Sequence, residues 1–443
     1  NLSGGDYRAG DIIGKYGIEE SWEGFLRGNA GGKQIEVDAL GREIALLKKV
    51  NPVPGNNIYL TIDLHTQEVA RRLMKGKAGA IVAIDPQNGK MIAMVSSPSF
   101  DPNIFATILT SEEWERLLRN PLNILTNRAM QGQYPPASTF KIITAAALLE
   151  ESVISPATEI DSGPVFEFGG RVYRDWREEG HGSINVHRAI VESSDTFFYQ
   201  TGLRLGIEKL AYYARGFGFG SKTGIEIKGE KAGLVPSKEW KLKVYGEPWY
   251  MGETISVSVG QGFLLATPLQ VLNAYAAIAN GGTLFLPQIV ERIETPAGEV
   301  LRDFLPKEIG RAPVSKRTLR ILQSALRGVV SDDKGTARFI RNGQFAIAGK
   351  TGTAQVTMLG EERIKAEEIP FRLRDHAWFV GYAPANDPRI AVAVLVEHGG
   401  FGAEVAAPLA LEVMKGYLLG GEERAVRGMS PERSMVQNEQ DAG

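Results

Sequence analysis

The 443-residue chain contains no cysteine and only five histidines. Without cysteine it cannot hold a disulfide, an iron–sulfur cluster or a thiolate zinc site, and it has no cysteine nucleophile. Its 50 Lys and Arg residues nearly balance 52 Asp and Glu residues. This balance argues against a nucleic-acid-binding protein, which usually carries a strongly basic face. No run of about 18 apolar residues occurs, so no segment has the length and apolarity of a bilayer-spanning helix.

The length and composition indicate a folded chain of two or three domains. Hydrophobic residues make up 43% and charged residues 23%, which is enough apolar material for a sizeable core. Pro52, Pro54 and Gly55 mark a break after a mixed leading segment, so residues 1–56 are predicted to be a small separate module. Residues 57–420 would form the main domain, and the polar residues 421–443 are predicted to be a disordered tail.

The hydrophobic pattern of the main domain predicts an α+β fold. Two apolar segments, 80–84 and 91–95, flank an Asn-Gly turn and indicate a β-hairpin covered on both faces. Residues 111–280 are mainly helical in pattern. Strand-like segments return at 345–348, 377–382 and 390–397 and are followed by a closing helix at 409–419. Strands at both ends of the chain with helices between them suggest one sheet packed against helices.

Ser138 and Lys141 are the first pair of residues that could carry chemistry. They follow two prolines and open an apolar helix, so Ser138 would lie near a helix N-terminus, where backbone N–H groups favour an oxyanion. Lys141 is three residues further on and shares the same helix face. A serine hydroxyl becomes a good nucleophile when a base removes its proton, and a lysine with a lowered pKa can be that base. The alternative is a helix cap beside a surface lysine. A second Ser-x-x-Lys, at Ser331 and Lys334, has charged residues inside it and suits a loop.

Two further segments have suitable residue types. Ser193 and Asp195 precede an aromatic stretch and could relay a proton and hold a substrate amide, although Ser and Asp are also common helix caps. Lys350, Thr351, Gly352 and Thr353 follow a strand-like segment. Period two places Lys350 and Gly352 on one face, and the missing side chain at Gly352 would let a substrate backbone approach. A second Lys-Thr-Gly at 222–224 has no strand before it.

Taken in order, Ser-x-x-Lys, Ser-x-Asp and Lys-Thr-Gly-Thr resemble the motif set of penicillin-binding proteins and serine β-lactamases. Residues 252–262, 267–270 and 280–282 resemble class B penicillin-binding proteins in particular. Residues 173–176, 180–182 and 248–250 are most similar to the cell-elongation subfamily, penicillin-binding protein 2.

This resemblance implies a serine transpeptidase fold, with a five-stranded antiparallel sheet flanked by helices. Residues 1–56 would then be the end of the family's N-terminal pedestal. The family also implies a membrane anchor before Asn1, a catalytic domain on the periplasmic or extracytoplasmic side of the inner membrane, and a SEDS-type glycosyltransferase as partner.

The resemblance also assigns roles to the motif residues. Ser138 would attack a stem-peptide D-Ala-D-Ala carbonyl, or a β-lactam, and become acylated. Lys141 would take the serine proton, favoured as a neutral amine by burial and by the charge of Lys350. Ser193 would pass the proton to the leaving group, and Asp195 stands where many relatives have Asn. Lys350 would hydrogen-bond Ser193. Two threonines, Thr351 and Thr353, would bind the substrate carboxylate, and the N–H groups of Ser138 and Thr353 would form the oxyanion hole.

Some relatives hold a metal beside the Ser-x-Asp motif with two Asp, a His and a Cys. Asp161, Asp175 and His181 match three of these ligands, but Ser194 stands in the cysteine position, and serine is a poor zinc ligand. We therefore predict no cofactor. The remaining alternatives are a DD-carboxypeptidase, a β-lactamase, which would need a deacylating Glu, or a non-enzymatic β-lactam sensor.

Overall fold

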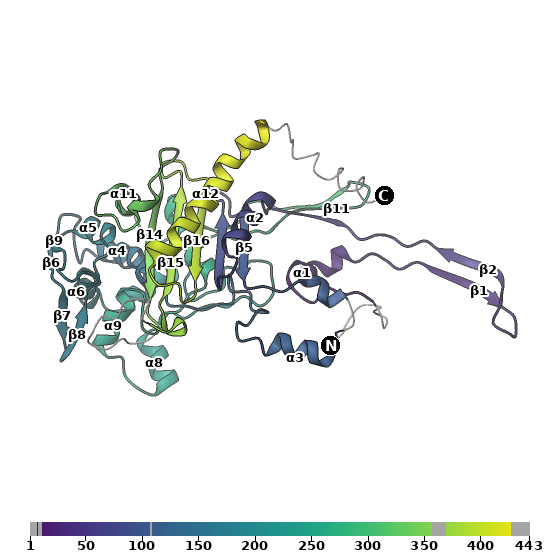
Figure 1. Cartoon of the computed structure of the whole chain (residues 1–443), viewed down its shortest axis with the longest axis horizontal. Helices are drawn as coiled ribbons and strands as arrows, with labels where there is room; N and C mark the ends of the chain where they lie inside the picture. The colour runs from purple at the N-terminus through teal and green to yellow at the C-terminus, as the bar shows by residue number, and fades with distance from the viewer. Residues whose placement is uncertain (1–6, 8–10, 107–108, 357–368, 427–443) are drawn as a thin grey trace.

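The computed structural model describes residue 7 and residues 11–106, 109–356 and 369–426 (Figure 1). The leading segment consists of helix α1 (Gly17–Leu26) and a hairpin of β1 (Gly32–Val37) and β2 (Glu43–Val50), which projects away from the main body. Trp22 of α1 is buried and packs edge-on against Phe304, with ring centroids 5.6 Å apart. Every residue of β2 is exposed. The helix is therefore anchored to the main body, whereas the hairpin is not.

The core of the main body is a five-stranded antiparallel sheet in the order β14-β15-β16-β4-β5. Its strands are β4 (Gly79–Ile84), β5 (Met91–Ser97), β14 (Ala348–Ala354), β15 (His376–Ala383) and β16 (Ile390–Val396). The first hairpin pairs with the last strands of the chain through β4 and β16. All residues of β4 are buried, and all of residues 91–95 on β5 except the half-buried Met94 are buried, so both faces of the predicted hairpin are covered. The order leaves β14, which carries the Lys-Thr-Gly-Thr segment, at the edge of this sheet.

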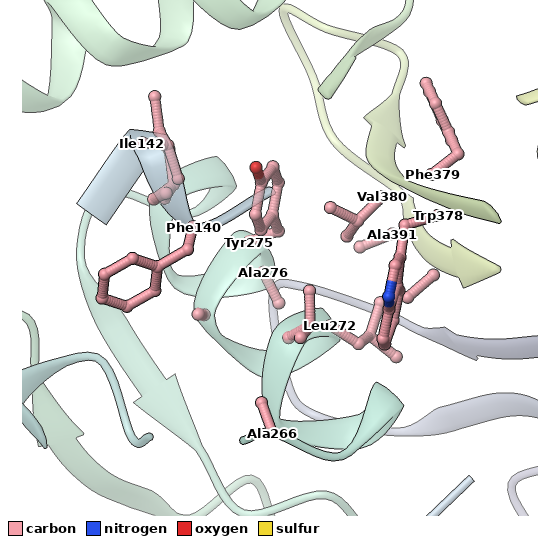
Figure 2. Close-up of a cluster of buried hydrophobic side chains, with 14 of the residues drawn as sticks. Phe140, Ile142, Ala266, Leu272, Tyr275, Ala276, Trp378, Phe379, Val380 and Ala391 are labelled. Atoms are coloured by element: carbon pink, nitrogen blue, oxygen red, sulfur yellow. The ribbon is translucent and has the colours of Figure 1, made fainter. Parts of the chain in front are cut away.

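Helices cover the sheet. Helix α10 (Pro268–Ala279) begins where Thr267 accepts the N–H of Gln270 and Pro268 occupies the first turn, where its missing N–H is no loss. Figure 2 shows Leu272 and Tyr275 of α10 facing Trp378 and Val380 of β15, while Phe379 points away. Helix α12 (Gly402–Val426) packs against β15 and β16, and α2 (Leu64–Leu73) packs against α12 and β5.

Helix α3 (Ser111–Leu118) lies near α1, away from β14 (Figure 1). The rest of the middle of the chain forms a mainly helical region on the β14 side of the sheet. Its helices are α4 (Lys141–Glu150), α5 (Val186–Val191), α6 (Asp195–Leu205), α7 (Ile207–Gly216), α8 (Lys238–Tyr245), α9 (Met251–Ser258) and α11 (Lys316–Ser331). The short 3₁₀ turns are η1 (Pro102–Ala106), η2 (Ala137–Phe140), η3 (Arg338–Ile340) and η4 (Phe371–Leu373). Small strands are β3 (Asn57–Leu60), β6 (Ile160–Ser162), β7 (Val165–Phe168), β8 (Arg171–Arg174), β9 (Gly182–Ile184), β10 (Thr283–Phe285), β11 (Val290–Glu294), β12 (Val300–Asp303) and β13 (Glu308–Arg311).

The α+β architecture with a five-stranded antiparallel sheet is confirmed. Two elements have other bounds in the structure than the sequence predicts. The strand expected at 345–348 is β14, which begins at Ala348 and runs through the Lys-Thr-Gly-Thr segment itself. The closing helix continues past the predicted start of the tail at 421, because α12 ends at Val426; residues 427–443 lie outside the described residues. Within the described ranges, no helix has the length and apolarity needed to cross a membrane.

Candidate active site

Ser138 lies in the 3₁₀ turn η2, which runs directly into α4 at Lys141. Ala137 has a φ of 51°, and its N–H donates to the carbonyl of Gly260 at 2.8 Å. A Cβ on Gly260 would lie 2.1 Å from the carbonyl oxygen of Ala137, so only glycine permits this approach. Ser138 itself is half-buried. The turn that carries Ser138 is therefore fixed by the contact between Ala137 and Gly260.

Lys141 joins the serine helix to the Ser-x-Asp motif. Its side chain is fully buried, and Nζ donates to the carbonyl oxygen of Ser193 at 2.8 Å and lies 3.3 Å from the Ser193 hydroxyl. Nζ is also ion-paired with Oδ1 of Asp195 at 2.8 Å. No hydrogen bond in the described part of the chain joins the Ser138 hydroxyl to Lys141.

The Ser-x-Asp motif forms the junction between two helices. Ser193 follows α5 with a φ of 57°, and Ser194 caps α6 by accepting the N–H of Phe197. The alternative of a helix cap therefore applies to Ser194, while Ser193 remains free to face Lys141. Burial raises the pKa of Asp195, and the ammonium of Lys141 opposes this shift.

Lys350 lies on β14 and is also fully buried. Its Nζ donates to the carbonyl oxygen of Thr351 at 3.1 Å. The expected hydrogen bond from Lys350 to Ser193 is absent among the described contacts, which corrects that part of the sequence interpretation. The lysine that contacts Ser193 in the structure is Lys141.

The pKa of Lys350 differs from the sequence expectation. Burial, together with the positive charge of Lys141, lowers the pKa of Lys350 well below its ordinary value, and the carboxylate of Asp195 opposes the shift. Lys141 has the carboxylate partner, since its Nζ lies 2.8 Å from Oδ1 of Asp195. The sequence predicts that Lys350 stays charged, and the direction of its pKa shift is opposite to that expectation.

The outer edge of β14 faces the serine turn. The side-chain amide of Gln261 donates to the carbonyl of Thr353 at 3.3 Å, so this carbonyl points away from β15. In an antiparallel pair the N–H and C=O of one residue point to the same side, so the Thr353 N–H also points outward. This direction fits an oxyanion-hole donor.

Gly352 does not provide the open space that the sequence suggested. A Cβ at this position would lie 3.1 Å from Cγ2 of Thr139 and 3.4 Å from the carbonyl oxygen of Pro136. The missing side chain thus lets β14 pack against the serine turn itself. Lys350 is expected to share this face with Gly352. In agreement, Lys350 lies close enough to Lys141, on the helix after the serine turn, for the positive charge of Lys141 to lower the pKa of Lys350.

Asp175 is a residue whose main contacts the sequence reasoning missed. Its Oδ2 accepts hydrogen bonds from the N–H groups of Asp195 (2.8 Å) and Thr196 (2.9 Å) and from the Ser194 hydroxyl (3.1 Å). Burial raises the pKa of Asp175, but hydrogen bonds from His181 and Thr196 outweigh burial, so the pKa lies well below its ordinary value. Asp175 thus holds the start of α6 and, with it, Asp195.

The three metal-ligand candidates do not form a metal site. Both ring nitrogens of His181 are occupied, Nε2 by Asp175 at 3.0 Å and Nδ1 by Glu192 at 3.1 Å. The third candidate, Asp161, is exposed. The described residues contain no group of three or more His, Asp or Glu placed to hold a metal ion. His181 is hydrogen-bonded to Asp175 and Glu192, and the exposed Asp161 and the serine at position 194 do not complete a set of zinc ligands around it.

We predict that Asp175→Asn lowers the acylation rate at Ser138 by about tenfold or more and the free energy of unfolding by about 2–4 kcal/mol. An amide oxygen accepts these donors less well than a carboxylate, and the amide NH₂ adds a conflicting donor. Penicillin acylation kinetics and thermal denaturation measure the two effects. Asp161→Asn is the matched control and should change neither, whereas equal effects of both substitutions would contradict the assignment.

The second copies of the Ser-x-x-Lys and Lys-Thr-Gly patterns lie on a helix end and on a loop. Ser331 ends α11, and Lys334 is exposed beyond it. Lys222 is exposed, and the next residue, Thr223, is held by Glu230 through its N–H and hydroxyl. Neither copy combines a buried lysine with a serine turn.

Lys350→Ala should therefore slow acylation of Ser138 by about a hundredfold or more, the range seen when one charge-stabilising donor of an active site is removed. Lys222→Ala should leave the rate unchanged. The second-order rate constants of the two variants and the wild type, measured with one penicillin, provide the comparison. Equal rates for wild type and Lys350→Ala would show that the strand copy is not part of the site.

Comparisons with known proteins agree with this geometry. Residues 79–415 match the penicillin binding protein transpeptidase domain, and residues 1–60 match the penicillin-binding protein dimerisation domain. The chain belongs to the penicillin-binding protein transpeptidase family.

One relative and two solved structures indicate the subfamily. The chain is 41% identical over 421 residues to the peptidoglycan D,D-transpeptidase MrdA of Haemophilus influenzae, covering 93% of this chain and 64% of that protein. It is similar to the crystal structure of Pseudomonas aeruginosa PBP2 in complex with WCK 5153, with a TM-score of 0.78, 37% identity and coverage of 92% and 84%. It is also similar to Helicobacter pylori PBP2 in complex with MreC, with a TM-score of 0.80, 34% identity and coverage of 92% and 72%. The chain spans about 64% of the H. influenzae relative.

Proposed function

We propose that the protein is a peptidoglycan D,D-transpeptidase that cross-links stem peptides during cell elongation and is acylated by β-lactams. The observation that carries this proposal is the position of Lys141. It follows Ser138 by three residues, pairs with Asp195 at 2.8 Å and lies 3.3 Å from the Ser193 hydroxyl. A buried lysine that links a serine turn to a second hydroxyl is one arrangement that can supply the base for serine acyl transfer.

Substrate binding would prepare the base. A substrate carboxylate arriving near Lys350 would stabilise the ammonium form there. The new charge would repel the ammonium of Lys141 and favour its neutral amine. Because Lys350 has the lowered pKa before binding, it can accept a proton when the anion arrives. Lys141 would then be free to act on Ser138.

The chemical steps follow from this arrangement. Oγ of Ser138 attacks the carbonyl carbon of the penultimate D-Ala, and its proton passes to Lys141. The N–H groups of Ser138 and Thr353 stabilise the oxyanion. The C–N bond breaks as Ser193 gives its proton to the leaving D-Ala amine, and the ammonium of Lys141 returns a proton to Ser193. An amine of a second stem peptide then attacks the ester and forms the cross-link, and its proton passes through Lys141 to the released Ser138 oxygen.

The proposed setting is the outer face of the cytoplasmic membrane. Relatives of this chain include proteins named peptidoglycan D,D-transpeptidase MrdA and a PBP2 solved with MreC. Another similar structure is titled as a peptidoglycan synthase complex that coordinates polymerisation and cross-linking. These similarities support a membrane-anchored enzyme whose catalytic domain faces the periplasm and whose partner is a SEDS-family glycosyltransferase.

Incubation with a fluorescent penicillin, followed over hours, tests the proposal against its alternatives. A transpeptidase should give a long-lived adduct and, with a D-Ala-D-Ala pentapeptide and an acceptor amine, a cross-linked product. Rapid turnover of the label would indicate a β-lactamase, and release of D-Ala without cross-linking would indicate a carboxypeptidase. A stable adduct without any peptide reaction would indicate a sensor. The two glutamates before the Ser-x-Asp motif, Glu178 and Glu179, are exposed, which disfavours a buried deacylating base at either position.

A further inference from the structure

Thr336 lies where two of the motif-bearing elements meet. Its hydroxyl is 2.8 Å from the hydroxyl of Thr351, on β14. Its N–H donates to the carbonyl of Val191 at 3.3 Å, two residues before Ser193. One residue of the loop after α11 thus contacts both the strand of the Lys-Thr-Gly-Thr segment and the helix that leads into the Ser-x-Asp motif.

The loop holds Thr336 in place. The N–H of Gly335 donates to the carbonyl of Asp332, and the N–H of Ala337 donates to the carbonyl of Val329, each at 3.0 Å. Gly335 and Ala337 are buried, whereas Thr336 is half-exposed. The backbone on both sides of Thr336 is therefore hydrogen-bonded to the end of α11, and these bonds fix the position from which the Thr336 hydroxyl reaches Thr351.

We propose that Thr336 is a positioning residue that orients the Thr351 hydroxyl toward the terminal carboxylate of the substrate. A hydroxyl has one proton to donate, and a carboxylate can only accept. If Thr336 donates its proton to Thr351, the proton of Thr351 is directed at the carboxylate, and the two hydrogen bonds strengthen each other. Without Thr336, the Thr351 hydroxyl loses this partner and can turn to other acceptors. The inference rests on the proposed function, since it assigns Thr351 to the carboxylate.

The test compares a penicillin, whose carboxylate stands in for that of the stem peptide, with the same penicillin as its methyl ester. Acylation rates are measured by mass spectrometry for wild type, Thr336→Val and Thr336→Ser. The valine variant should react about tenfold more slowly with the penicillin, the loss typical of one hydrogen bond to a charged group, but within about twofold of wild type with the ester. The serine variant, which keeps the hydroxyl, should restore the rate with the penicillin.

Three outcomes would overturn the inference. Equal losses with both compounds would make Thr336 a structural residue only, and so would failure of serine to restore the rate. Equal wild-type rates with penicillin and ester would remove the carboxylate as the recognised group. The failure of the proposed function looks different, because wild-type protein would then form no cross-linked product from a D-Ala-D-Ala pentapeptide and an acceptor amine, whatever its rates with the two compounds.

Discussion

Ser138→Ala is expected to abolish covalent labelling by penicillin completely. The half-buried hydroxyl of Ser138 is the nucleophile assigned to η2, and alanine has none to replace it. The other hydroxyl of η2, that of Thr139, is buried and donates to the carbonyl of Pro136 at 2.6 Å. Intact-mass spectrometry should show the added mass of the penicillin on the wild type and no added mass on the variant. The fold should persist, because the turn is held by backbone contacts of Ala137 with Gly260 rather than by the serine side chain.

Ser331→Ala is the matched control, since Ser331 belongs to the second Ser-x-x-Lys. It ends α11, and its hydroxyl is hydrogen-bonded to Asp332 at 3.2 Å. This variant should be labelled at the wild-type rate. An adduct on the Ser138→Ala variant, or a labelled peptide containing Ser331, would show that Ser138 is not the nucleophile and would contradict the proposed mechanism.

Lys141→Arg is expected to react about 10²–10⁴-fold more slowly with penicillin, the usual contribution of a general base, although it keeps a positive charge. Arginine cannot be deprotonated in a protein, so it can pair with Asp195 but cannot take the proton of Ser138. If Lys141 acted only as a charge or by packing, arginine would retain much of the rate. The larger guanidinium must also fit a fully buried site, so a second variant is needed.

Lys141→Ala provides that second variant, and both are measured at several pH values with thermal denaturation as a check of folding. Both should be nearly inactive, and raising the pH should not rescue the arginine variant. An arginine variant within about tenfold of wild type, roughly 1.4 kcal/mol of barrier, would exclude Lys141 as the base. Because Lys350 has the lowered pKa in the substrate-free protein, it would then be the first group to examine as the proton acceptor.

The local features of the site could be predicted from the sequence, because they depend on neighbouring residues. Two prolines before Ser138 and an apolar stretch after it predict the helix start, and the three-residue spacing places Lys141 on the same face. The hairpin of β4 and β5 follows in the same way from two apolar segments around an Asn-Gly turn. The order of the three motifs then indicated the family.

Only the tertiary structure decided which distant groups meet and how they are charged. The contact of Lys141 with Asp195, like that of Thr336 with Thr351, depends on how α4, α6, α11 and β14 pack. The residue types around Thr336 carry no local signal for its contact, and Asp175 was visible only as an incomplete metal pattern. The lowered pKa of Lys350 could not be predicted from the sequence for the same reason. Charge depends on burial and on the nearest carboxylate, and packing placed Asp195 against Lys141 and left the buried Lys350 without a paired carboxylate among the described residues.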